Sequence, residues 1–307
     1  MTTKLQSFAK INLGLEVLGT RPDGYHEIRT IFQTIDLCDT ITLKENQTGV
    51  ISVSGTDATI DWGGKNTVSQ AFRQLYGNFH LRQGYDVRIV KNIPPGSGLG
   101  GGSGNAAVIL LFLCEHFQLR ISLTDLLELA RGIGADVPFF LFGGTALGEG
   151  IGERITLIPE ITSQRLALIV PRMAVSTRFV FSHCPLTNAP FASKIDSFTR
   201  TGDFSILENK LEDVTLRFFP EIGKIKEQLR TLGLNTAWMS GSGSAVFALL
   251  GRKRTMKLKR AFPDLRICRT INRATYHHHI GVWPNGKASA FGAEIRRFES
   301  SHPREHT

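Results

Sequence analysis

The sequence has no apolar run long enough to cross a bilayer. The longest uninterrupted apolar stretch near its glycine-rich segment, residues 106–114, is far shorter than the ~20 residues that a membrane-spanning helix needs. The N-terminus also lacks a basic region followed by an apolar core, the pattern of a secretory signal. We therefore expect a cytoplasmic protein with no membrane partner.

Cysteine is scarce and scattered along the chain. The four cysteines form no C-x-x-C pair, which disfavours both a zinc knuckle and a disulfide framework: Cys38, Cys114, Cys184 and Cys268. We expect reduced, partly buried thiols, as is usual in the cytosol. Three adjacent histidines at 277–279 have no Asp, Glu or Cys at ligand spacing nearby, so we predict a frayed tail there and no metal-ligating residues.

Acidic residues are nearly absent from one late segment. Between Arg252 and Arg273 the sequence has nine Lys or Arg against one acid, Asp264, and this segment carries most of the net charge of +9. A basic patch can bind nucleic acid in a salt-sensitive way, here through the basic residues of 257–260. A solvated helix face explains the same charges, and we consider nucleic acid an unlikely partner.

The rest of the composition is that of a globular protein of two lobes. Residues 9–17 alternate between apolar and polar, which predicts a half-buried strand with Lys10 and Asn12 on its polar face. A Pro-Asp-Gly turn then brings Tyr25 and His26 to the start of a second strand. A packed turn explains these last two residues about as well as contact with a ligand does.

The strongest functional signal is a glycine-rich loop that leads directly into an apolar helix. Gly96 to Gly104 comprises six Gly, two Ser and one Leu, and AAVILLFL follows closely. We predict that the helix starts near Asn105 and directs its free N–H groups at the loop, which makes a phosphate site. A flexible linker has similar composition, but linkers do not usually run into a buried segment. A Walker loop is excluded because no Lys precedes Ser103.

A second candidate is Asp136, which lies just before a short helix predicted at residues 138–142. The structural alternative is that this carboxylate only caps the helix. An alternative also exists for Lys10, which by itself reads as an exposed lysine on a strand.

Taken in order, several segments resemble the GHMP kinase superfamily, named for galactokinase, homoserine kinase, mevalonate kinase and phosphomevalonate kinase. The resemblance spans about residues 5 to 272 and rests on AKINLGLEV (9–17), RPDGYHEIRTIFQTIDLCDTI (21–41), PPGSGLGGGSGNAA (94–107), GADVPFF (134–140), GEGIGE (148–153), NKLE (209–212) and SGSGSAVF (240–247). Asp-Gly-Tyr-His at 23–26 favours a member that phosphorylates a cytidine-bearing small molecule; a mevalonate or homoserine kinase is the alternative. Gly104 and Phe8 replace the Ser and Pro that relatives usually carry.

The resemblance implies an α+β fold of two lobes and an ATP-dependent kinase. Residues 1–160 should form an N-terminal lobe related to ribosomal protein S5, and residues 161–275 a ferredoxin-like C-terminal lobe. The tail, 276–307, has no counterpart and should be poorly ordered. We expect a monomer or a weak homodimer.

The resemblance also assigns roles to residues. ATP, with Mg²⁺, should lie between the lobes, and Lys10 and Asp136 should be the catalytic residues, with Asp136 accepting the proton of the acceptor hydroxyl. The predicted substrate-binding residues are Asn12, Tyr25, His26, Lys91 and Phe181, the last stacking on the base. The predicted ATP-binding residues are Pro94, Pro95, Gly96, Ser97, Gly98, Leu99, Gly100, Gly101, Gly102, Ser103 and Gly104.

Overall fold

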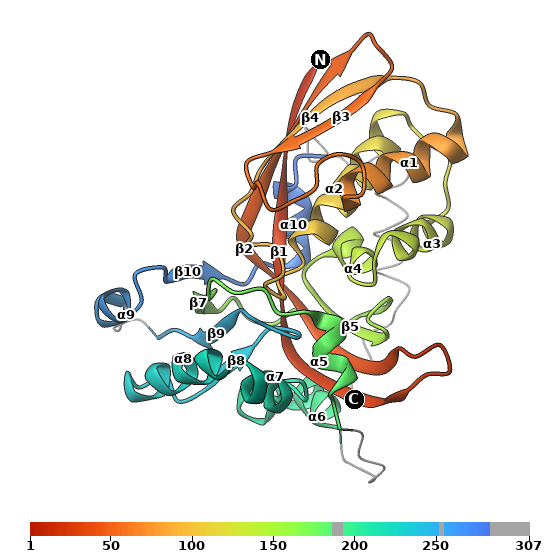
Figure 1. Cartoon of the computed structure of the whole chain (residues 1–307). Helices are drawn as coiled ribbons and strands as arrows, with labels where there is room; N and C mark the ends of the chain where they lie inside the picture. The colour runs from red at the N-terminus through yellow and green to blue at the C-terminus, as the bar shows by residue number, and fades with distance from the viewer. Residues whose placement is uncertain (186–192, 252–254, 283–307) are drawn as a thin grey trace.

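Two β-sheets, each with helices packed on it, make up the chain (Figure 1). The computed structural model describes residues 1–185, 193–251 and 255–282. The predicted α+β architecture of two lobes is confirmed. The first sheet ends at Leu157 and the second begins at Arg165.

The first sheet is built around a very long hairpin. Its path runs β3-β4-β2-β5-β6, with β1 paired to β2, and only β3 and β4 are parallel. The strands are β1 (Thr2–Thr20), β2 (His26–Asn46), β3 (Ile51–Gly55), β4 (Gly84–Val90), β5 (Thr145–Gly150) and β6 (Arg154–Leu157). The second strand that the sequence predicted after the turn is β2, which is long because it pairs along its length with three other strands.

The helices of the first lobe cover this sheet (Figure 1). They are α1 (Thr67–Phe79), α2 (Gly101–His116), α3 (Leu123–Ile133) and α4 (Val137–Phe142). Asn66 begins α1 by accepting a hydrogen bond from the amide of Ser69, and Ser122 begins α3 by accepting one from the amide of Asp125. Helix α2 is apolar on every side and is buried from Gly104 to Cys114, so it forms the centre of the lobe.

The second sheet is antiparallel, in the order β10-β7-β9-β8. Its strands are β7 (Arg165–Ile169), β8 (Ala237–Met239), β9 (Val246–Leu249) and β10 (Arg266–Arg269). The helices that follow β7 are α5 (Thr177–Ser182), α6 (Lys194–Thr201), the 3-10 helix η1 (Phe204–Ile206), α7 (Glu212–Phe218), α8 (Pro220–Thr231), α9 (Thr255–Ala261) and α10 (Arg273–His279).

Strand β1 connects the two lobes because it contributes to every hydrophobic cluster of the described core. Phe8 packs in the first lobe, Ile11 between the lobes and Leu15 in the second. A strand that is covered on both faces buries its polar residues as well, and Lys10 and Asn12 are each 3% exposed. The exposed strand lysine considered above is therefore excluded.

The chain does not stop folding at Tyr276, where we placed the start of the tail. Helix α10 runs through this position, and Tyr276, Ile280 and Val282 are buried in the core of the first lobe. The Tyr276 hydroxyl donates to the carbonyl of Phe140 in α4 at 2.5 Å. The boundary was wrong because the His-rich sequence conceals one apolar face; residues 283–307 lie outside the described residues.

None of the helices in the described ranges has the length and apolar character required to span a membrane.

Candidate active site

Lys10 and Asp136, which are far apart in sequence, meet between the lobes. The Nζ of Lys10 lies 3.4 Å from Oδ2 of Asp136, and it donates to Oδ1 of Asn12 at 2.6 Å. The Lys10 side chain is 4% exposed, whereas that of Asp136 is 31% exposed. A buried ammonium therefore faces a carboxylate that solvent, or a ligand, can reach.

Asp136 is not a helix cap. It occupies the N-cap position of α4, but its side chain makes no capping hydrogen bond, and its backbone is already in the helical region (φ −83°, ψ −13°). A capping residue usually has extended backbone and accepts a bond from the second or third helical amide. The carboxylate is thus free of the structural task that we considered as the alternative.

Asn12 is held so that its amide oxygen faces Lys10. Its Nδ2 donates to Oγ1 of Thr30 at 2.8 Å, and that hydroxyl donates to the carbonyl of Gly14 at 2.7 Å. Because Nδ2 is used in this way, the amide oxygen is directed at the Lys10 ammonium. The chain Thr30–Asn12–Lys10 fixes the ammonium beside Asp136.

The glycine-rich loop adjoins this lysine. Helix α2 begins at Gly101, earlier than the Asn105 that we predicted, so the last four loop residues, 101–104, belong to its first turn. A Cβ on Gly100 would lie 3.1 Å from Cγ of Lys10, and one on Gly104 would lie 2.9 Å from the carbonyl of Phe8. Glycine is needed here because the helix N-terminus packs directly against β1, and this approach brings its free amides close to Lys10 and Asp136.

A second small-residue loop, between β8 and β9, makes hydrogen bonds to the glycine-rich loop. The Ser240 hydroxyl donates to the carbonyl of Gly98 at 3.0 Å and accepts from the amide of Asn12 at 3.2 Å. The amide of Ala245 donates to the carbonyl of Ser97 at 3.0 Å. Asn209 supports this loop through Nδ2, which donates to the carbonyls of Met239 and Gly241 at 2.8 and 2.7 Å. Both loops are therefore hydrogen-bonded to β1, through the amides of Lys10 and Asn12.

Lys91 does not lie where the sequence analysis placed it. Its ammonium is paired with Asp39, a fully buried carboxylate that also accepts from the amides of Asn92 and Ile93 at 2.7 and 2.8 Å. It lies 3.1 Å from the position that a Cβ on Gly101 would take. Lys91 therefore adds positive charge beside the first turn of α2, apart from the predicted partners Tyr25, His26 and Phe181.

Those three aromatic residues line one cavity of about 450 Å³, which is within the usual range for small-molecule sites. One wall is the turn of the β1–β2 hairpin, and the other is α5 of the second lobe. The rings of His26 and Phe181 lie 5.3 Å apart, and Tyr25 is 57% exposed. The cavity also reaches Ala135, the neighbour of Asp136, and its lining residues are Asp23, Gly24, Tyr25, His26, Ile28, Ala135, Ile151, Thr177, Arg178, Phe181 and Ser182.

Comparison with known proteins shows the family of the chain. Residues 66–144 match the GHMP kinases N terminal domain, and residues 194–264 match GHMP kinases C terminal. The chain is 42% identical over 247 residues to the 4-diphosphocytidyl-2-C-methyl-D-erythritol kinase of Geobacter metallireducens, covering 80% of this chain and 88% of that protein. A protein of the same name from Lachnoclostridium phytofermentans is 37% identical over 270 residues, covering 86% and 92%. The chain belongs to the 4-diphosphocytidyl-2-C-methyl-D-erythritol kinase family of GHMP kinases.

Solved structures give the same fold. A crystal structure of 4-(cytidine 5'-diphospho)-2C-methyl-D-erythritol kinase superposes with a TM-score of 0.74 at 30% identity, covering 87% of this chain and 99% of that one. Homoserine kinase from Cytophaga hutchinsonii superposes with a TM-score of 0.66 at 18% identity, covering 88% and 95%. The similarity to homoserine kinase concerns the fold alone. The comparisons therefore favour the cytidylyl-substrate branch of the family over the homoserine kinases.

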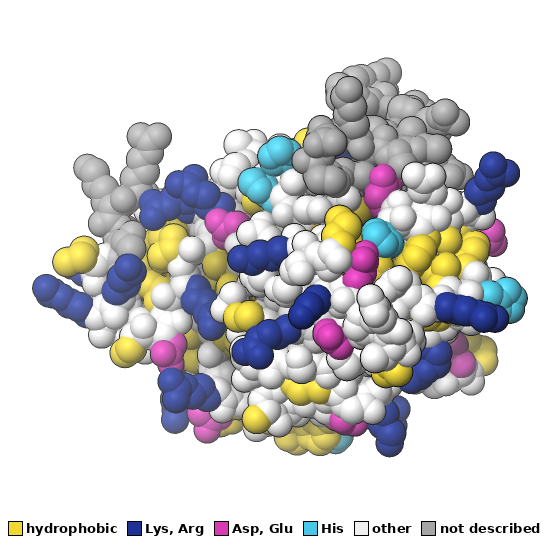
Figure 2. Space-filling model, turned by 90° about the horizontal axis from the view of Figure 1, so that it is seen from above, with side chains coloured by type: hydrophobic (Ala, Val, Ile, Leu, Met, Phe, Trp, Pro, Cys, Tyr) yellow, Lys and Arg dark blue, Asp and Glu magenta, His cyan; other side chains and the backbone are white. Residues whose placement is uncertain are grey.

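Some basic residues of the segment 252–273 make structural contacts. Arg266 donates to the carbonyl of Asn92 at 2.5 Å, and Arg273 pairs with Glu160 at 3.2 Å. Figure 2 shows Lys and Arg side chains gathered at the left edge, over α9, where Lys257, Lys259 and Arg260 are exposed. Arg252, Lys253 and Arg254 lie outside the described residues.

Sequence reasoning missed three polar residues of the site. Ser240 and Asn209 appeared only within segments that resemble the family, because the contacts of both are to distant backbone. Arg178 lines the cavity from α5, and a lone exposed arginine on a short helix gives no pattern that would distinguish it.

Proposed function

We propose that this protein transfers the γ-phosphate of ATP to the 2-hydroxyl of 4-diphosphocytidyl-2-C-methyl-D-erythritol, giving the 2-phosphate and ADP in non-mevalonate isoprenoid precursor biosynthesis. The observation that carries the proposal is the Lys10–Asp136 contact of 3.4 Å. This pair has the glycine-rich loop on one side and the aromatic cavity on the other. An acceptor hydroxyl that enters from the cavity thus meets, beside the Asp136 carboxylate, a phosphate that the glycine-rich loop holds.

The acceptor end is recognised in the cavity. Tyr25 and Phe181 offer aromatic faces for a cytosine ring, and His26 offers ring nitrogens for its polar edge. Arg178, on the same wall as Phe181, supplies a fixed positive charge for the diphosphate that follows the base. The erythritol then extends toward Ala135 and reaches Asp136.

The chemistry consists of one proton transfer and the stabilisation of negative charge. Asp136 accepts the proton from the attacking hydroxyl, while Lys10 stabilises the ionised carboxylate and orients the oxygen. The amides of the first turn of α2, with Lys91 beside them, hold the phosphates and stabilise the charge that develops on the transferred group. Positioning of this kind is the main requirement of phosphoryl transfer.

Magnesium fits the site as an ion that arrives with the nucleotide. Within the described ranges no three residues of the His, Cys, Asp and Glu types come together as a metal site. Mg²⁺ typically keeps several waters and is held by one or two carboxylates together with substrate phosphates. Asp136 would supply one such carboxylate, and the ion would neutralise phosphate charge.

The substrate assignment is tested by incubating the purified protein and [γ-³²P]ATP with the cytidylyl compound, mevalonate or homoserine. We expect phosphate transfer to the cytidylyl compound alone. Transfer to mevalonate or homoserine, with none to the cytidylyl compound, would assign the protein to another branch of the GHMP kinases.

The mechanism is tested with Asp136→Asn, which keeps the shape of the side chain and removes its basicity. We expect kcat to fall by about 10²- to 10⁴-fold, as for the loss of a general base, while the Kd for ATP, measured by calorimetry, stays near that of the wild type. Asp125→Asn, a change in the exposed first turn of α3, is the matched control and should leave both quantities unchanged. Undiminished turnover in Asp136→Asn would remove this carboxylate from the chemistry.

A further inference from the structure

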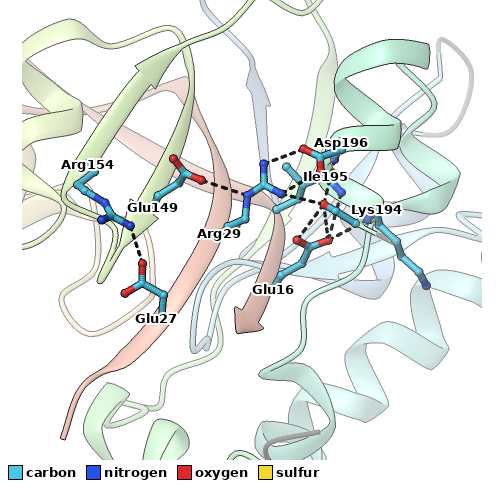
Figure 3. Close-up of polar contacts among 9 residues, drawn as sticks. Glu16, Glu27, Arg29, Glu149, Arg154, Lys194, Ile195 and Asp196 are labelled. Atoms are coloured by element: carbon cyan, nitrogen blue, oxygen red, sulfur yellow. Dashed lines mark hydrogen bonds and ion pairs between the residues drawn. The ribbon is translucent and has the colours of Figure 1, made fainter. Parts of the chain in front are cut away.

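A cluster of charged side chains fastens the β1–β2 hairpin to α6 of the second lobe (Figure 3). At its centre, Arg29 of β2 donates to both carboxylate oxygens of Asp196, at 3.0 and 2.7 Å. It also donates to the Ser193 hydroxyl at 3.2 Å, and its Nε lies 3.3 Å from a carboxylate oxygen of Glu149 in β5. The guanidinium of Arg29 therefore connects β2 and β5 of the first lobe to α6 of the second.

Glu16 of β1 makes a second connection to the same helix (Figure 3). Its carboxylate is buried, with the residue 4% exposed, and it accepts from the amides of Lys194 and Ile195 at 2.9 and 3.2 Å. It also accepts from the Ser193 hydroxyl at 3.1 Å. The first amides of a helix have no intrahelical partner and attract negative charge, so Glu16 stabilises the start of α6 while holding it to β1.

The cluster lies behind the wall of the substrate cavity. Successive side chains of a strand point to opposite faces, so His26 and Ile28 share one face of β2, and Glu27 and Arg29 share the other. His26 and Ile28 line the cavity, whereas Glu27 pairs with Arg154 at 2.5 Å. Fixing Arg29 therefore fixes the strand whose opposite face meets the ligand.

The turn at the end of the hairpin is rigid by itself. The amide of Arg21 donates to the carbonyl of Tyr25 at 2.7 Å, and the amide of Tyr25 donates to a carboxylate oxygen of Asp23 at 3.1 Å. Arg21 also pairs with Asp23 at 3.1 Å. The turn therefore moves as one unit, and its distance from α5 depends on where the strands behind it are held.

We propose that Arg29 is a positioning residue that sets the separation of the two cavity walls, Tyr25 and His26 on one side and Phe181 on the other, and thereby the affinity for the cytidine-bearing substrate. The identity of this ligand rests on the function proposed above. The hydrogen bond from Arg29 holds the pKa of Asp196 below its ordinary value, so the pair stays charged at every pH at which the enzyme would be assayed.

The test is a kinetic comparison of Arg29→Met, Asp196→Asn and the double variant. We expect each single change to raise the KM for the cytidylyl substrate about fivefold, in keeping with a partly exposed ion pair, with kcat and the KM for ATP changed by less than about twofold. The KM of the double variant should be no higher than that of the poorer single variant, because both single changes break the same Arg29–Asp196 pair. Glu227→Gln is the matched control, since it breaks a similar two-bond Arg–carboxylate pair on α8 and should leave every constant unchanged.

Hydrogen exchange provides a readout that does not depend on the substrate. The amides of residues 16–20 and 26–30, which pair the two strands behind the turn, should exchange faster in Arg29→Met and Asp196→Asn than in the wild type, and those of α2 should not. If the wild type phosphorylates mevalonate instead of the cytidylyl compound, the proposed function fails, and the exchange rates still decide whether Arg29 holds the hairpin. Equal exchange in all variants, or a fall in kcat with an unchanged KM, would overturn the positioning role.

Discussion

The hydroxyl of Tyr276 provides a quantitative test of how the C-terminal helix is attached. Its ring is fully buried beneath α4, and its hydroxyl donates to the carbonyl of Phe140 at 2.5 Å. This carbonyl lies in the last turn of α4, where a helix has no amides of its own to offer. Tyr276→Phe keeps the ring and leaves a buried carbonyl without this partner, so it should lower the free energy of unfolding by about 1–3 kcal/mol.

Tyr276→Ala removes the ring as well and should cost more. The ring packs against Gly143, where a Cβ would lie only 2.3 Å from it, and it makes an edge contact with Phe8 at a centroid distance of 5.9 Å. By analogy with other aromatic-to-alanine changes in cores, we expect a loss of about 3–5 kcal/mol. This order of effects would show that residues 273–282 belong to the folded lobe.

The assay is urea denaturation followed by circular dichroism, with Tyr25→Phe as the control. Tyr25 is 57% exposed, so losing its hydroxyl should change the unfolding free energy by less than about 0.5 kcal/mol. If Tyr276→Phe were as stable as the control, the bond to Phe140 would not contribute, and the account of α10 as an anchored helix would be wrong.

Two further predictions concern the glycine-rich loop and the buried thiols. Gly98→Ala should reduce ATP affinity, measured by calorimetry, at least about tenfold. The reason is that the backbone φ of Gly98 is +78° and the new Cβ would lie 2.2 Å from the carbonyl oxygen of Ser240. The control is Gly77→Ala in α1, which has open space around it and should bind ATP normally; equal affinities of the two variants would contradict the packing described here. Burial raises the pKa of the Cys114 thiol to about 12, so the folded state favours the neutral thiol. The stability that this neutral thiol contributes is complete below the pKa of the thiol in the unfolded chain, about 8.5, and is lost as the pH rises toward 12. The stability difference between the wild type and Cys114→Ala should therefore shrink between about pH 8 and pH 10, and a constant difference in urea denaturation would contradict it.

Local sequence determined the elements whose signals are contained within short segments. The helix caps Asn66 and Ser122 are signals of this kind, because a cap depends on residues within one turn of it. The apolar run after Gly104 predicted a buried helix, and the ordered motifs predicted the family, which the comparisons confirm. The catalytic roles of Lys10 and Asp136 remain predictions, although the structure brings the two side chains together.

Tertiary structure alone decided which distant residues become partners. Lys91 pairs with Asp39 across two strands and so lies beside the first turn of α2, away from Tyr25 and His26. Arg29 meets Asp196, and Tyr276 meets Phe140, over sequence separations of 167 and 136 residues. Periodicity and capping patterns report only on neighbours along the chain, whereas these contacts follow from how β1 and β2 are packed between two lobes. For that reason the loop, most of the helices and three aromatic residues of the cavity were predicted, but Arg178 and the ion pairs behind the cavity were not.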